Sequence, residues 1–247
     1  MLLHGLTGFA EIWAPVARTL ARDFHVLALD QRGHGDSEWA ADGCYDIEAH
    51  VIDLALAARA LGVDEFTLAG HSMGARNAAF FAACFPQRVQ RLVLIEGRPE
   101  DEPAGTALLC RAVADMPGRM RYRSEAAAYL ARLLPRLSPA SLRRWSRFAV
   151  RPHVDGGYLW KYDPRIREMA REGWVLTDLW PFLESVPCPT LVVYGSESGL
   201  LDAATAGRMA RVMPRARAVE VQGAGHALPL ERPRAVARLL REFLAET

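Results

Sequence analysis

The chain has 247 residues, of which 51% are hydrophobic and 24% are charged, and its formal net charge is +1. This balance excludes a disordered chain and a general polyanion-binding protein, and the length suits one domain with a subordinate insertion. The four cysteines show no close pairing, which argues against a disulfide framework or a zinc site. Because no apolar run approaches the roughly 20 residues of a membrane helix and the start lacks a secretory signal, we expect a soluble cytoplasmic protein.

Short runs rich in Val, Leu and Ile alternate with amphipathic stretches along most of the chain. Strands that are apolar on both faces and alternate with helices predict an α/β fold, a mostly parallel sheet with helices on both faces. After a short strand at the start, the predicted strands are Phe24–Leu29, Phe66–Ala69, Leu92–Ile95, Thr190–Tyr194 and Ala218–Val221. The predicted helices are Ile12–Leu20, Ile47–Leu61, Ala75–Cys84, Ala203–Val212 and Arg234–Leu244.

Between Gly97 and Pro187 the pattern changes to helices without strands, with many arginines and large aromatic residues. From Arg98 to Arg171 there are 15 Lys or Arg residues against eight Asp or Glu residues. We therefore predict a core formed by residues 1–97 and 188–247, with residues 98–187 inserted as a helical lid.

The stretch GHSMG, Gly70 to Gly74, follows a predicted strand and precedes a predicted helix. A G-x-S-x-G in this context is typical of a nucleophile elbow, a sharp and strained turn that presents a serine hydroxyl. Its two glycines let the strand and the helix approach closely. The alternative is an ordinary turn in which Ser72 caps the helix, but both flanking elements favour Ser72 as a nucleophile.

The stretch LLHGLTG supplies a second part of such a site. Gly5 allows a tight turn after the strand and leaves the N–H of Leu6 free. Together with the N–H of Met73, it would form an oxyanion hole for a tetrahedral intermediate. We predict that His4 is a structural hydrogen-bonding residue in this loop.

Two further loops follow predicted strands. DQRGHGDS, Asp30 to Ser37, lacks the lysine of a phosphate-binding loop and is best interpreted as a structural turn held by Asp30 and Arg32. GAGH, ending at His226, lies between the last predicted strand and the terminal helix. An imidazole there can take the proton of Ser72 and hand it to the leaving group; the alternative is a loop histidine without a catalytic role.

These stretches, in this order, resemble the α/β-hydrolase family over essentially the entire chain. The resemblance implies serine-based hydrolysis without a metal or an organic cofactor, with the acid and the histidine following the serine along the chain. The family usually begins with additional strands before the His-Gly loop. Either the sheet is shorter here, or the sequence begins downstream of the native start.

The position of the acid departs from the usual pattern. In most of the family it follows the strand before the last one, as G-x-x-D, but counting from Gly195 gives Ser198, which cannot carry a negative charge. Glu197 and Asp202 are neighbours, and Asp202 is positioned to cap a helix. The chain resembles a subgroup that carries the acid after the strand following the elbow, which implies Glu96, with Glu197 and Asp202 as alternatives.

We therefore predict a serine hydrolase that cleaves a carboxylic ester or a related acyl bond. Amide, thioester, lactone and carbon–carbon bonds are open alternatives, as is a small-molecule receptor of the same fold without catalysis. Arg76 and Ser198 are candidate substrate-binding residues, with a structural contact to the lid as an equally favoured alternative for Arg76. The arginine excess suggests an anionic acyl group as one hypothesis. We expect a small acyl molecule as the partner, and neither nucleic acid nor a membrane.

Overall fold

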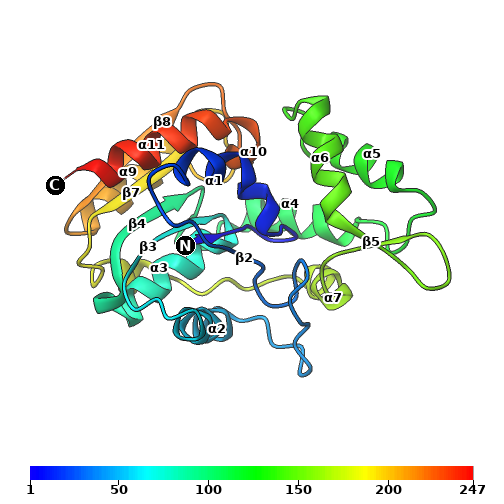
Figure 1. The fold of residues 1–247 in the computed structure, drawn as a ribbon, viewed down its shortest axis with the longest axis horizontal. Helices are drawn as coiled ribbons and strands as arrows, with labels where there is room; N and C mark the ends of the chain where they lie inside the picture. The colour runs from blue at the N-terminus through cyan, green and yellow to red at the C-terminus, as the bar shows by residue number, and fades with distance from the viewer. Residues whose placement is uncertain (247) are drawn as a thin grey trace.

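The computed structural model describes residues 1–246, which form a six-stranded parallel sheet flanked by helices (Figure 1). The strand order is β2-β1-β3-β4-β7-β8. This confirms the predicted α/β class. The strands are β1 (Leu2–Leu3), β2 (Ala28–Leu29), β3 (Phe66–His71), β4 (Val89–Ile95), β7 (Thr190–Gly195) and β8 (Ala216–Val221).

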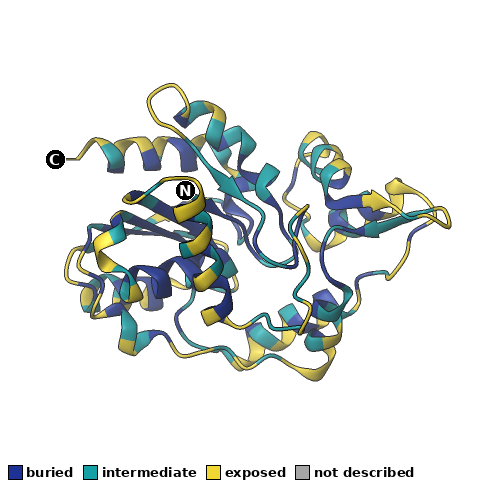
Figure 2. Ribbon diagram, turned by 60° about the horizontal axis from the view of Figure 1, so that its bottom comes forward, coloured by how far each residue is buried: buried dark blue, intermediate teal, exposed yellow. Residues whose placement is uncertain are grey.

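Two hydrophobic clusters, one on each face of the sheet, hold the core together. Along β4, Leu92 and Leu94 belong to one cluster, and Val93 and Ile95 to the other. Because successive strand residues point to opposite faces, an unbroken apolar run is what a strand covered on both sides requires. Figure 2 shows buried residues gathered in the sheet and on the inner sides of the helices.

The helices of the core keep the predicted order. On one face lie η1 (Ala10–Trp13), α1 (Ala14–Leu20) and α11 (Pro233–Ala245), and on the other α2 (Ile47–Ala60), α3 (Met73–Cys84) and α9 (Ala203–Val212). Two short elements, η2 (Pro86–Arg88) and α10 (Leu228–Glu231), complete the core. None of the helices among residues 1–246 is long and apolar enough to cross a bilayer.

The segment between β4 and β7 contains five helices among the described residues, but it also contains a hairpin that the sequence analysis missed. The helices are α4 (Pro103–Ala114), α5 (Arg123–Leu133), α6 (Pro139–Ala149), α7 (Pro164–Glu172) and α8 (Trp180–Leu183). The expectation of a segment without strands was wrong, because β5 (Val150–Pro152) pairs antiparallel with β6 (Tyr158–Trp160). Gly156 and Gly157 between them have φ of 83° and 76°, the left-handed conformation that a tight turn needs.

The strand predicted at Phe24–Leu29 is also shorter than expected. Only Ala28 and Leu29 form a ladder, because their partner strand β1 offers only two residues for pairing. Phe24 is exposed, and this part of the chain lies outside the ladder.

The glycines of the elbow are required by close backbone packing. A Cβ on Gly70 would lie 2.1 Å from the carbonyl oxygen of Gly74, and one on Gly74 would lie 2.5 Å from the carbonyl oxygen of His4. Neither neighbour is a flexible side chain that can yield. The elbow therefore brings α3 directly against the loop after β1.

We predict that Gly74→Ala lowers the free energy of unfolding by about 3 kcal/mol, because a methyl group has to displace backbone atoms. Gly207→Ala in α9 is the control, since its Cβ would meet only the end of the Arg211 side chain, at 3.4 Å. We expect that substitution to stabilise the protein by about 0.5–1 kcal/mol. Urea unfolding measures both, and equal stabilities for the two variants would contradict the packing argument.

Candidate active site

Ser72 lies at the turn between β3 and α3 in a strained conformation. Its φ of 54° and ψ of −118° are rare for a residue with a Cβ. The side chain makes no capping hydrogen bond to the helix, although the backbone carbonyl accepts from the amides of Ala75 and Arg76. The helix-cap alternative therefore does not describe Ser72, whose hydroxyl points elsewhere.

His226 is within hydrogen-bond distance of both Ser72 and Glu96. Its Nε2 lies 3.0 Å from the Ser72 hydroxyl oxygen, and its Nδ1 lies 3.0 Å from Oε2 of Glu96. A carboxylate can only accept, so Nδ1 of the neutral ring carries the proton and Nε2 accepts from the serine. The structure thus brings together the three residues that the sequence analysis grouped.

The Glu96 carboxylate is buried and fully hydrogen-bonded. Besides His226, its Oε1 accepts from the amide of Gly195 at 2.6 Å, and its Oε2 accepts from the hydroxyl of Ser198 at 2.5 Å. Such donors compensate for the cost of removing a carboxylate from water. Glu96 itself has a φ of 57°, which turns its side chain at the end of β4.

The alternative acids have other partners. Glu197 is half exposed and forms an ion pair with Arg136. Asp202 caps α9 through the amide of Thr205 at 2.7 Å and forms an ion pair with Arg98. Neither carboxylate is hydrogen-bonded to His226, which leaves Glu96 as the one that is.

Ser198 is not among the residues that line the cavity described below. Its hydroxyl donates to Glu96 and accepts from the amide of Leu200 at 3.2 Å. The geometry therefore supports a role in holding Glu96 and does not support the predicted contact of Ser198 with substrate.

The amides of Leu6 and Met73 have no acceptor among residues 1–246, and both residues line the same cavity as Ser72. The orientation of the first amide follows from its peptide plane. The carbonyl of Gly5 accepts from Nδ1 of His4 at 2.8 Å and from the amide of Gly8 at 2.9 Å. Since the N–H of a trans peptide points opposite to its C=O, fixing that oxygen also fixes the Leu6 N–H.

A buried polar chain supports this loop. The amide of Gln31 donates to Nε2 of His4, so the His4 proton lies on Nδ1, where it bonds Gly5. Asn77 on α3 donates to the Gln31 side chain, which donates in turn to the His4 carbonyl. His4 is therefore a structural residue, as expected, while Gln31 and Asn77 carried no signal in the sequence.

The sequence analysis also missed two residues that hold the loop of His226. Nε2 of His71, the first variable residue of the GHSMG motif, donates to the backbone carbonyl of His226 at 2.8 Å. The Glu231 carboxylate accepts from the amides of Gly225 and Ala227, on either side of that histidine. The histidine at the motif's second position was the only visible signal for either contact.

The Asp30 turn holds the fold rather than a ligand. Its carboxylate accepts from the amides of Ala10 and Asp36, at 2.7 and 2.9 Å. Arg32 does not contact Asp30 but pairs with Asp53, at 2.6 Å. Both residues have the structural role expected of them, through different partners.

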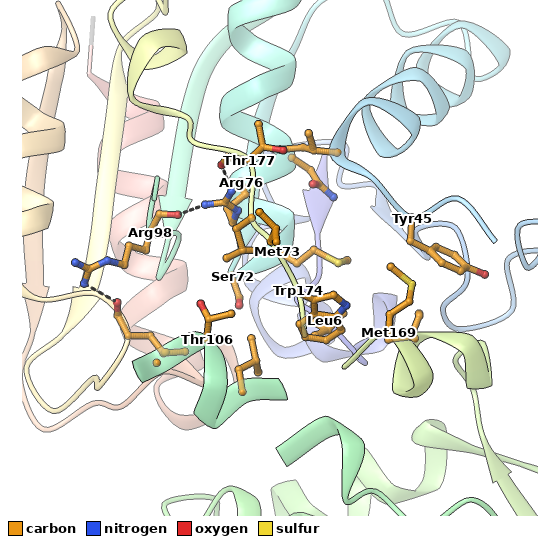
Figure 3. Close-up of a pocket in the computed structure, with 18 of the residues that line it drawn as sticks. Leu6, Tyr45, Ser72, Met73, Arg76, Arg98, Thr106, Met169, Trp174 and Thr177 are labelled. Carbon is orange, nitrogen blue, oxygen red and sulfur yellow. Dashed lines mark hydrogen bonds between the residues drawn. The ribbon is translucent and has the colours of Figure 1, made fainter. Parts of the chain in front are cut away.

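A cavity of about 430 Å³ lies beside Ser72 and is lined by residues of the core and of the segment between β4 and β7 (Figure 3). Its volume falls in the range typical of small-molecule sites. Apolar side chains form much of its wall, among them Leu6, Met73, Leu109, Ile166, Met169, Trp174 and Leu176. Arg76, a predicted substrate-binding residue, also lines it.

Four buried histidines surround the site. Burial lowers the pKa of His34 to about 4 and those of His50 and His71 to about 3, and it holds the pKa of His4 well below its usual range. They are therefore uncharged at neutral pH. His34 and His50 line the cavity and present it with neutral rings.

Residues 1–233 match the family described as alpha/beta hydrolase fold, and the chain therefore belongs to the α/β-hydrolase family. It is 31% identical over 247 residues to the 2-(acetamidomethylene)succinate hydrolase of Mesorhizobium japonicum, covering 99% of this chain and 87% of that protein. It is 27% identical over 252 residues to the esterase YbfF of Escherichia coli, covering 99% and 92%.

The fold is also similar to a solved crystal structure of E-2-(acetamidomethylene)succinate hydrolase. The TM-score is 0.90 at 28% identity, over 99% of this chain and 90% of that one. The similarity to named hydrolases and an esterase supports a hydrolase, in agreement with the predicted class.

We predict that the free energy of unfolding decreases as the pH is lowered from about 6.5 to about 5. Unfolded histidines take up a proton near a pKa of about 6.5, whereas the four buried ones stay neutral until much lower pH. The unfolded state therefore binds more protons in this window, and each histidine contributes a slope of up to about 1.4 kcal/mol per pH unit. The stabilisation is complete above this window.

Urea titrations at stepwise pH measure that slope. His50→Gln should reduce the slope by about the contribution of one histidine. His25 is exposed, so His25→Gln should leave the slope unchanged. A stability that is flat between these pH values would contradict the burial of neutral rings.

Proposed function

We propose that the protein is a serine hydrolase that cleaves a carboxylic ester through an acyl-enzyme intermediate on Ser72. One observation carries this proposal. Two hydrogen bonds of 3.0 Å connect the Ser72 hydroxyl through His226 to the buried Glu96, at the wall of a cavity that Leu6 and Met73 also line, and the amides of these two residues have no acceptor among residues 1–246. This is the donor and acceptor set that acyl transfer needs.

In the first half-reaction, the Ser72 oxygen attacks the carbonyl carbon while Nε2 of His226 takes its proton. Glu96 holds the ring in the required tautomer and stabilises the imidazolium that forms. The oxyanion accepts hydrogen bonds from the amides of Leu6 and Met73. When the tetrahedral intermediate collapses, His226 gives its proton to the leaving alcohol, and the acyl group stays on Ser72.

In the second half-reaction, water takes the place of the alcohol. His226 removes a proton from that water, which attacks the acyl carbon, and the same two amides again stabilise the oxyanion. Collapse expels the Ser72 oxygen, which regains its proton from His226. The carboxylic acid leaves, and the site returns to its initial state.

The inserted segment, residues 98–187, is proposed to act as a lid over a core of residues 1–97 and 188–247. Leu109, Ile166 and Trp174 of this segment line the cavity together with residues of the elbow. They support recognition of an apolar acyl group, and they restrict the access of water to the oxyanion. Neither a metal nor an organic cofactor enters the proposed reaction, and a cytoplasmic location stays a prediction.

Other bonds share the same oxyanion step, so amide, thioester, lactone and carbon–carbon substrates are alternatives that only turnover assays separate. A carboxylated acyl group is a specific candidate, favoured by the succinate in the name of the Mesorhizobium relative and by Arg76 and Arg98 in the cavity wall. The contacts of these arginines, described below, argue against it. A receptor without catalysis would bind such esters and leave them intact.

We predict that Ser72→Ala and His226→Ala each lower kcat by as much as about 10⁶-fold. Glu96→Gln should lower it by about 10⁴-fold, because an amide favours the wrong tautomer of His226. Hydrolysis of short p-nitrophenyl esters measures the rates, labelling by a fluorophosphonate probe reports the reactivity of Ser72, and circular dichroism reports folding.

Glu197→Gln and Asp202→Asn are matched controls, because both carboxylates are close in sequence to the expected acid position but have other partners. Each should retain near wild-type activity, and Asn preserves the helix cap. A near wild-type Glu96→Gln together with an inactive Asp202→Asn would refute the proposed acid. Labelling without turnover of any ester would favour the receptor.

A further inference from the structure

Both ends of the inserted segment meet at one side chain of the elbow helix. The guanidinium of Arg76, one turn after Ser72, donates from Nη1 to the carbonyls of Arg98 and Pro99, at 2.5 and 2.9 Å. Its Nη2 donates to the carbonyl of Thr177. Figure 3 shows the guanidinium of Arg76 between the backbone at Arg98 and the backbone at Thr177. Arg76 therefore bonds the first residues of the segment and a residue near its end.

The two ends also contact each other. The amide of Leu179 donates to the carbonyl of Pro99 at 3.0 Å. We call this junction the neck of the segment. It consists of the three bonds from Arg76 to carbonyl oxygens and the bond from Leu179 to Pro99, and the chain leaves and re-enters the core through it. Because Arg76 lies in the first turn of α3, which directly follows Ser72, the neck is fixed relative to the serine.

The charge of Arg76 has two carboxylates in its neighbourhood, although none of the ion pairs among residues 1–246 includes it. Burial lowers its pKa to about 10, so it stays protonated at neutral pH, and Asp101 and Asp178 lie close enough to oppose that shift. Its two terminal nitrogens donate to carbonyl oxygens. These bonds take three of the five N–H donors of the guanidinium, both on Nη1 and one on Nη2, so only Nε and the second N–H of Nη2 are left for a substrate carboxylate.

The second arginine of the cavity wall is occupied as well. Arg98 pairs through Nη2 with Glu100 at 3.1 Å and through Nη1 with Asp202 at 3.0 Å. Within residues 1–246, the wall contains five carboxylates, those of Asp46, Glu96, Glu100, Glu102 and Glu172, against these two guanidinium groups. An acyl group ending in a carboxylate would therefore enter a wall of net negative charge.

We propose that Arg76 is a positioning residue that clasps both ends of the inserted segment to the elbow helix, and that the site takes acyl groups without a carboxylate. This inference rests on the proposed hydrolase function and specifies its substrate class. It assigns the two arginines of the wall to the architecture of the cavity. The acyl group is then selected by the apolar side chains of the cavity wall, among them Trp174, Met169 and Leu6 (Figure 3).

The first experiment compares two esters of the same shape. They are the mono-p-nitrophenyl ester of adipic acid and the p-nitrophenyl ester of the corresponding primary amide, adipamic acid, assayed at pH 8. We expect kcat/KM to be at least about tenfold higher for the amide-ended ester, because a carboxylate enters a cavity whose wall has five carboxylates against two guanidinium groups. Equal values, or a preference for the acid-ended ester, would overturn the substrate class.

The second experiment changes Arg76. In Arg76→Lys, an ammonium cannot reproduce the planar fork, so kcat/KM should fall about tenfold for both esters, and their ratio should stay constant within about twofold. A loss confined to the acid-ended ester would show instead that Arg76 binds substrate carboxylate, and would overturn the clasp. In Arg76→Ala, methylguanidinium should restore part of the rate for both esters, whereas methylammonium should not.

Arg88→Gln is the matched control, because Arg88 also donates to two backbone carbonyls, those of Asp64 and Val63, at 3.0 and 2.8 Å, but lies outside the cavity. It should leave kcat/KM unchanged and show no rescue. If kcat/KM fell as much in Arg88→Gln as in Arg76→Lys, the effect of Arg76 would be one of general protein stability, and the proposed positioning role would be overturned. If Arg76 variants fail to fold, the ester ratio of the wild-type chain still decides the substrate class.

These outcomes are separable from failure of the proposed function. Absence of turnover of both esters by a folded chain, or full activity in Ser72→Ala, would refute the hydrolase mechanism itself. Turnover that depends on Ser72 but prefers the acid-ended ester would refute only the further inference.

Discussion

The buried carboxylate of Glu96 is the contact on which the rest of the site depends. It accepts from the Gly195 amide, the Ser198 hydroxyl and the His226 ring, so it joins three segments that are distant in sequence. Removing it would leave these donors buried without an acceptor, a larger cost than one lost bond. Ser198 occupies the position where the family resemblance leads one to expect the acid, and there it supplies a donor to the carboxylate from the neighbouring strand. The carboxylate bonded to His226 therefore comes from the end of β4, and the loop after β7 supplies a hydroxyl donor to it.

Much of the fold could be predicted because it is encoded locally. Parallel strands buried on both faces are continuous apolar runs, and helix α9 was predicted at its observed bounds, Ala203–Val212. The hairpin β5–β6 was missed because its strands have three residues each, too short for an alternating pattern. Its one local signal was the Asp-Gly-Gly turn before Tyr158, which the helical expectation for the insertion overrode.

The site was predictable to the extent that its residues belong to motifs. Ser72 and His226 follow strands in recognisable stretches, and Glu96 was reached through the resemblance after the usual position proved to be a serine. The contact of His71 was out of reach, and for Arg76 a contact with the lid was one of two alternatives but its partner atoms could not be named, because both side chains bond backbone carbonyls of remote segments. Every residue has a backbone carbonyl, so the residue types at the partner positions give no sign of these contacts in the sequence. Such contacts follow from the fold and cannot precede it.

Backbone strain is concentrated where the chemistry is proposed. Among residues 1–246, the only non-glycine residues with left-handed φ are Thr7, Ser72 and Glu96, which follow β1, β3 and β4. Each such conformation costs of order 1–3 kcal/mol and persists only where packing determines it. These three strands are adjacent in the sheet, so the strained turns converge at one edge. In the ladder, Ile95 pairs with Val193 of β7, so the next turn of either strand reaches the same space beside His226. That register explains physically how the Glu96 carboxylate after β4 and the Ser198 hydroxyl after β7 come to lie together.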